Sequence, residues 1–133
     1  MTFIVVDTSA VMAIVLAEPG ADWLSARMQA SDRRLMSTGT ALELGLVLES
    51  RTRTLTALDA LRSLQIELTA FDEAQFELGV RAWRKFGKGR HPATLNLGDC
   101  FTYALAKVTG YPILCVGNDF ARTDLAILSP PPL

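Results

Sequence analysis

Four acidic side chains stand where predicted strands and helices meet. Asp7 follows one short apolar run and Asp119 follows another, while Glu43 and Asp99 fall in the first turns of predicted helices. In an open parallel sheet, the carboxyl ends of the strands and the helices that follow them line one crevice. Asp99 precedes its strand, so it joins the others only if its helix also begins at that edge. The pattern predicts one acidic site.

Carboxylates gathered in this way repel one another and lose water, which raises pKa values and is unfavourable unless a cation lies between them. Oxygen ligands without a His or Cys set suit Mg²⁺ or Mn²⁺, and a single histidine, His91, argues against a zinc site. Such an ion can activate water and stabilise charge on a phosphate group. The hydroxyls of Thr8 and Ser9, beside Asp7, suit contact with water or phosphate, or capping of the next helix.

Each acid also has a simpler structural interpretation. Asp7 is a residue type that caps helices, and Thr40 and Glu43 match the S/T-x-x-E capping box. Asp99 suits the positive end of a helix dipole, and Asp119 suits a turn. It is the joint placement of the four acids, rather than any one of them, that favours a metal site.

Strands and helices alternate along the chain. Strands are predicted at 3–6, 34–38, 66–71 and 112–116, with 125–128 compatible with a fifth, and helices at 9–16, 21–30, 41–51, 54–64, 72–86 and 96–109. The alternation predicts a single α/β domain over 1–133, a three-layer α/β/α arrangement with a central, mainly parallel sheet. The helix at 41–51 is apolar nearly all round, which predicts burial by its own domain and by a partner.

The charge balance is uneven along a chain of 133 residues that is 50% hydrophobic, 20% charged and of net charge −1. No acid occurs from 78 to 98, whereas this stretch holds five basic residues, the basic segment: Arg81, Arg84, Lys85, Lys88 and Arg90. Interleaved with Trp83 and Phe86, the basic segment is predicted to hold an RNA backbone. The alternative is a solvated helix face with its aromatic rings in the core.

The remaining composition limits location and redox chemistry. The longest uncharged runs, 8–17 and 108–118, are shorter than the roughly 18 residues of a membrane span. The N-terminus lacks the basic region of a signal peptide, so no membrane association and a cytoplasmic location are expected. Cys100 and Cys115 stand in apolar surroundings and are predicted to be reduced, buried thiols.

The order and spacing of these motifs resemble a PIN-domain ribonuclease, and within that group the VapC-type toxins of bacterial toxin–antitoxin pairs. The resemblance is carried by Asp7-Thr-Ser-Ala, by Asn96-Leu-Gly-Asp99-Cys and by the stretch 117–124, and it spans essentially the whole chain. It implies an α/β/α sandwich that hydrolyses RNA phosphodiester bonds with Mg²⁺ or Mn²⁺. It also implies a homodimer and a small antitoxin whose C-terminal segment covers the acidic site.

By motif position, the resemblance makes Asp7, Glu43, Asp99 and Asp119 the catalytic acids, with the metal held by Asp7, Asp99 and Asp119. Asn118 stands where some members carry the fourth acid. Asp124 either assists the site or, as the favoured interpretation, caps the final turn.

Two other classes of function are weighed against this one. A non-catalytic RNA-binding or regulatory module on the same fold would use the acids only as caps. A receiver-type phosphoryl-transfer domain is disfavoured, because Asp7 stands alone and no lysine follows Lys107. A dinucleotide-binding fold is disfavoured too, because no G-x-G-x-x-G follows the first strand.

Overall fold

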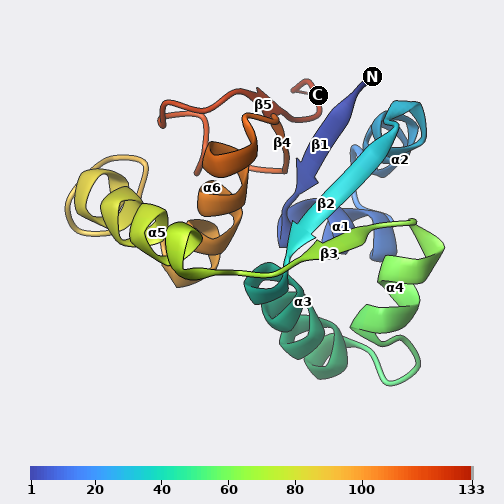
Figure 1. The fold of residues 1–133 in the computed structure, drawn as a ribbon. Helices are drawn as coiled ribbons and strands as arrows, with labels where there is room; N and C mark the ends of the chain where they lie inside the picture. The colour runs from blue at the N-terminus through green and yellow to red at the C-terminus, as the bar shows by residue number, and fades with distance from the viewer. Residues whose placement is uncertain (133) are drawn as a thin grey trace.

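A parallel sheet of five strands runs through the middle of the domain in the order β3-β2-β1-β4-β5 (Figure 1). The computed structural model describes residues 1–132. The strands are β1 Phe3–Val6, β2 Arg33–Ser37, β3 Glu67–Thr69, β4 Ile113–Leu114 and β5 Ile127–Leu128. Each neighbouring pair is parallel, so all the strands end at the same edge. The central position of β1 explains its apolar sequence, because a strand covered on both faces has no polar side.

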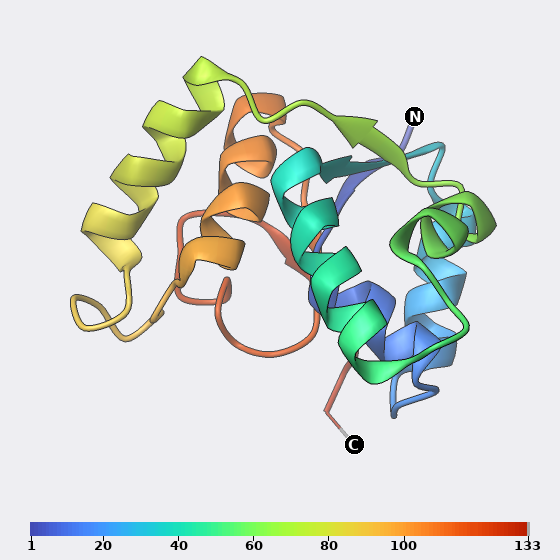
Figure 2. The same ribbon diagram turned by 90° about the horizontal axis from the view of Figure 1, so that it is seen from below.

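Helices cover both faces of the sheet. They are α1 Thr8–Val15, α2 Ala21–Ala30, α3 Thr38–Arg51, α4 Ala57–Ser63, α5 Glu73–Phe86 and α6 Leu97–Thr109. Because side chains alternate along a strand, Ile4 and Val6 of β1 pack into one core with α1 to α4, whereas Val5 packs into the other with α5 and α6. Figure 2 shows α5 beside α6 and α3 beside α6. The predicted three-layer α/β/α domain is confirmed.

The predicted elements are present, but several begin or end elsewhere. Helix α3 begins at Thr38, not near Thr40, because Ser37 at the end of β2 accepts a hydrogen bond from Gly39 N (3.2 Å) and caps the helix directly. The predicted capping box from Thr40 to Glu43 is therefore wrong, and Glu43 lies in the second turn of α3. Helix α4 begins at Ala57, where Thr56 and Asp59 form the capping box instead.

Two expectations about the chain as a whole can be compared with the structure. Within residues 1–132, none of the helices has the length and apolar character needed to cross a membrane. Cys100 and Cys115 are both buried and both free, as predicted.

Candidate functional site

Asp7 lies at the end of the central strand, where it caps α1. Its Oδ2 accepts hydrogen bonds from Ser9 N (3.2 Å) and Ser9 Oγ (2.8 Å), and its Oδ1 accepts one from Thr102 Oγ1 of α6 (2.7 Å). The cap that the sequence allowed is therefore real. However, three donors from two helices fix the orientation of one buried carboxylate, which is more than a cap requires.

The hydroxyl of Thr102 is the part of the site that sequence reasoning missed. Thr102 and Thr40 are fully buried, and their Oγ1 atoms lie 3.0 Å apart. Since a hydroxyl has one proton and that of Thr102 is given to Asp7, Thr40 is the donor to Thr102. A sequence signal did exist, because Thr102 is a polar residue three positions after Asp99 in an otherwise apolar helix face.

Glu43 projects from α3 toward the start of α6 and is half-buried. Its Oε1 accepts a hydrogen bond from Thr8 Oγ1 (2.8 Å), so Thr8 positions an acid rather than capping a helix. Burial raises the pKa of Glu43, the hydrogen bond from Thr8 opposes this, and the charge of Asp7 raises it further. The carboxylate lies against the backbone of Gly98, where a Cβ atom would overlap it.

Asp99 reaches the same edge because α6 begins there. It forms a reciprocal capping box with Asn96, in which Asn96 N donates to Asp99 Oδ2 (3.0 Å) and Asp99 N donates to Asn96 Oδ1 (2.9 Å). Burial raises the pKa of Asp99 to about 7; the Asn96 hydrogen bond lowers it, and the charges of Asp7, Asp119 and Glu43 raise it. The charges of the other three predicted acids therefore act on Asp99, although burial has the larger effect.

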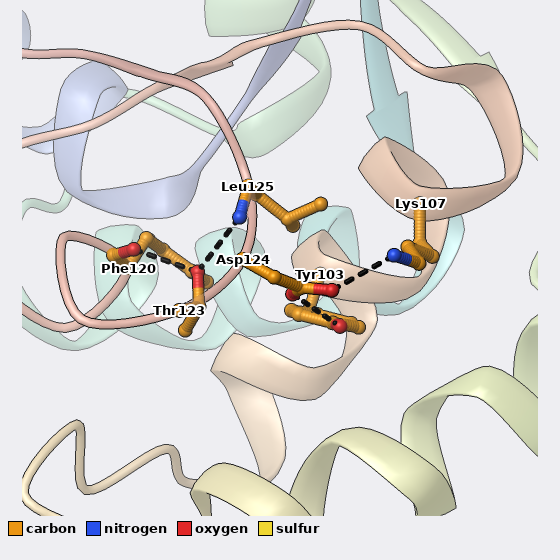
Figure 3. Close-up of polar contacts among 6 residues, drawn as sticks. All are labelled: Tyr103, Lys107, Phe120, Thr123, Asp124 and Leu125. Carbon is orange, nitrogen blue, oxygen red and sulfur yellow. Dashed lines mark hydrogen bonds and ion pairs between the residues drawn. The ribbon is translucent and has the colours of Figure 1, made fainter.

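Asp119 is the most exposed of the four acids. It lies in the β4–β5 loop (residues 115–126), beside Asn118, whose carbonyl accepts a hydrogen bond from Ala121 N (3.2 Å) in a turn. The sequence favoured a capping role for Asp124 in the final turn, and this prediction is wrong. The Asp124 carboxylate instead accepts hydrogen bonds from Tyr103 and Lys107 of α6 (Figure 3).

The arrangement suits a hard divalent cation, although the carboxylates alone do not form a complete set of metal ligands. Among residues 1–132, no group of three or more His, Cys, Asp or Glu side chains is close enough to hold a metal ion. Mg²⁺ commonly binds through one or two carboxylates and several waters, so it does not require such a group. The atoms that could bind the cation are all oxygens. Burial and then the charges of the neighbouring acids raise the pKa of Asp99, and a cation would favour its charged form.

The two buried thiols, Cys100 and Cys115, lie near this site but are unreactive. Burial raises the pKa of Cys115 to about 12, and the charges of Asp7, Asp119 and Asp99 contribute. Burial and the charge of Asp99 raise the pKa of Cys100 to about 11. Because the thiolate is the form that attacks carbon or binds metal, neither cysteine is suited to catalysis.

The basic segment occupies the end of α5 and the loop that leads to α6. All five of its basic side chains are exposed, and within residues 1–132 the ion pairs are Arg33–Glu67 and Lys107–Asp124, which leaves the basic segment without one. Arg90 stacks 4.1 Å from the ring centre of Trp83, which is 42% exposed. Phe86 is buried in the core, as expected if the aromatic rings of this helix serve packing. That alternative therefore holds for Phe86 but not for Trp83.

The close contact between α3 and α6 gives a test of the site. We expect Gly98→Ala to push the Glu43 carboxylate away, because the added methyl group would overlap it. Strain of this kind costs about 1–3 kcal/mol of stability. Displacement of an acid that is predicted to support a metal should cost about tenfold or more in activity. Cleavage assays and thermal denaturation would measure both.

Gly45→Ala on α3 is the matched control, because a Cβ there would meet only Ala57 Cβ at 3.6 Å, an ordinary contact. Normal metal-dependent activity in Gly98→Ala would show that the position of Glu43 is unimportant.

Comparison with known proteins places this geometry in a family. The PIN domain family model matches residues 4–125. Ribonuclease VapC30 of Mycobacterium tuberculosis is 42% identical over 130 residues, which cover 96% of this chain and 99% of that protein. The fold is shared with M. tuberculosis VapC20, described as a sarcin–ricin loop cleaving toxin (TM-score 0.71, 16% identity, 92% and 96% of the two chains). It is shared too with a chain of a toxin–antitoxin complex from Klebsiella pneumoniae (TM-score 0.70, 14% identity, 98% and 99%). The chain therefore belongs to the PIN-domain family, among the VapC ribonucleases.

Proposed function

We propose that this protein is a metal-dependent endoribonuclease that hydrolyses RNA phosphodiester bonds and acts as the toxin of a type II toxin–antitoxin pair, inhibiting growth and translation. The observation that carries the proposal is the convergence of acids from separate elements: Glu43 of α3 accepts a hydrogen bond from Thr8, next to Asp7, and lies against Gly98, next to Asp99. Acids that served only as caps would have no reason to converge. The 42% identity to a protein named as a ribonuclease supports the same conclusion.

In this proposal Asp7, Asp99 and Asp119 hold Mg²⁺ or Mn²⁺. When bound, such an ion activates water and stabilises charge on the scissile phosphate. Asp7 is held ready for it by Ser9 and Thr102, and Glu43 by Thr8. Asp119, on the exposed loop, would supply the third carboxylate.

The basic segment holds the RNA backbone in this proposal. We expect the double variant Arg81→Ala/Arg84→Ala to weaken RNA binding at low salt and to reduce the slope of log affinity against log salt by about 1.4, because each lost phosphate contact on a single strand removes about 0.7. Binding is measured with a short RNA in the presence of EDTA, so that no cleavage intervenes.

The control for this measurement is Arg27→Ala/Arg62→Ala, which removes two exposed cations from α2 and α4. Equal salt slopes for the two double variants would mean that the basic segment has no special role.

A largely apolar surface adjoins the acids, and we propose that it serves a homodimer and a small antitoxin. Leu42 and Leu46 of α3 are each 65% exposed, and Leu97 of α6 is 75% exposed. Cavities of about 420 and 490 Å³ lie on either side of Leu97 and Phe101, which line both. Apolar surface of this kind marks protein interfaces. The antitoxin would also place an Arg or Lys against the acids, and all these components would meet in the cytoplasm.

The direct test is incubation of the purified protein with total RNA, with and without Mg²⁺ or Mn²⁺, followed by mapping of the new RNA ends. Defined ends that appear only with metal support the proposal. The capping roles of Asp7 and Asp99 favour one rival, a non-catalytic RNA-binding module. RNA binding without any product, even when Mg²⁺ or Mn²⁺ is present, would support that rival and contradict the proposed function.

A further inference from the structure

The β4–β5 loop, which carries Asp119, is joined to α6 by two hydrogen bonds that the side chain of Asp124 accepts. Asp124 Oδ1 accepts a hydrogen bond from Tyr103 OH (2.7 Å), and Asp124 Oδ2 accepts one from Lys107 Nζ (2.8 Å) (Figure 3). Although burial would raise it, the pKa of Asp124 is lowered by the hydrogen bonds from Lys107 and Tyr103. The anchor is therefore a carboxylate, with a different donor on each oxygen.

The place where Asp124 is fastened relates this anchor to the acidic site. Asp99, Tyr103 and Lys107 are spaced four residues apart on α6, so they follow one another along one face of the helix. Helix α6 thus carries Asp99 and also binds the β4–β5 loop, which carries Asp119.

The N-terminal end of the same loop is linked to Asp7, the other buried acid, through Ser9. Val116 N donates a hydrogen bond to Ser9 Oγ (3.0 Å), and Ser9 Oγ donates to Asp7 Oδ2 (2.8 Å). Between the two ends, Phe120 is buried in the core, and Thr123 Oγ1 donates to its carbonyl (2.7 Å). Asp119 therefore stands on a loop whose ends are tied to the two elements that carry buried acids.

We propose that Asp124 is a positioning residue that holds Asp119 in register with Asp99. The need for an anchor follows from exposure and charge, because Asp119 is exposed and its charge has the same sign as the charges of Asp7, Glu43 and Asp99. An exposed acid on an unanchored loop would move outward into solvent. The inference rests on the proposed function, since it assigns the held position to cation binding.

The test begins with the loop itself. In Asp124→Ala, trypsin cleavage after the exposed Arg122 in metal-free protein should accelerate about five- to tenfold, because the loop loses two hydrogen bonds to α6. Glu67→Gln is the matched control, since it breaks an ion pair of similar exposure, Arg33–Glu67 (2.6 Å), on β2 and β3. Unchanged cleavage in Asp124→Ala would overturn the anchor.

The second measurement tests positioning rather than mere support. Titration calorimetry with Mn²⁺ alone should show about tenfold weaker binding to Asp124→Ala, the lower end of the loss typical when residues behind a metal ligand are changed. In an Asp119→Asn background, Asp124→Ala should add little, because it acts through Asp119. Equal losses in both backgrounds, or wild-type affinity in Asp124→Ala, would overturn the proposal.

Failure of the proposed function would look different. Wild-type protein would then neither bind Mn²⁺ nor cleave RNA, whereas faster trypsin cleavage of Asp124→Ala would still show that Asp124 anchors the loop.

Discussion

Replacing Asp99 with Asn should lower metal-dependent RNA cleavage by at least about 100-fold, the loss typical when one preorganised electrostatic contact is removed from an active site. The fold should survive, because only Asp99 Oδ2 is needed to accept the hydrogen bond from Asn96 N. An amide oxygen can take over that bond while the amide nitrogen faces the acidic site, where it cannot bind a cation. Cleavage at saturating Mg²⁺, with circular dichroism to check folding, measures both expectations.

The chain offers a closely matched control for this substitution. Asp59 occupies the same third position of a capping box, in α4, where it accepts a hydrogen bond from Thr56 N (3.4 Å) and belongs to no acidic cluster. Asp59→Asn should therefore retain full activity. Full activity in Asp99→Asn as well would remove the central support for a metal-dependent nuclease.

Asp7→Asn should also abolish cleavage and growth arrest, but it is a less clean test. Asp7 accepts three hydrogen bonds on two oxygens, from Ser9 N, Ser9 Oγ and Thr102 Oγ1. An asparagine amide would have to turn its own donors toward one of these donors. We therefore expect loss of stability alongside loss of activity, which the sequence alone did not predict.

What the sequence could predict depends on the range of the interactions. Buried strands and amphipathic helices are local patterns, so the alternation of elements and the gathering of acids at strand ends follow from the chain itself. The central place of β1 could be anticipated only from the need to bring Asp7 near its neighbours. The order of all five strands could not, because it depends on how crossovers pack.

The errors have the same origin. The capping box at Thr40 and Glu43 is a valid local motif, yet Ser37 starts the helix three residues earlier, because β2 turns directly into α3. The hydrogen bond from Thr102 to Asp7 joins residues 95 positions apart, so the local pattern marks Thr102 as unusual but does not identify its partner. Asp124 was interpreted as a turn residue because its partners, Tyr103 and Lys107, lie about 20 positions earlier on α6 and no local pattern identifies them.

The metal-free protein should lose stability as pH rises from about 4 to about 7. Asp99 has a pKa of about 7 in the folded state against an ordinary value of 3.8, so between these pH values the folded chain keeps a proton that the unfolded chain has lost. Each pH unit in that window then lowers the free energy of unfolding by up to about 1.4 kcal/mol. The raised pKa of Glu43 acts in the same direction.

Denaturant titrations in EDTA across this pH range measure the slope, and Asp99→Asn should flatten it because the titrating group is gone. Mg²⁺ added above pH 7 should stabilise the wild type more than the variant, since a ligand stabilises only the state that binds it. If stability fell equally with pH in the two proteins, the pKa of Asp99 would not be raised in the folded state. A proton and a metal ion would then not compete for the Asp99 carboxylate. The charge argument for a cation among the four acids would be lost.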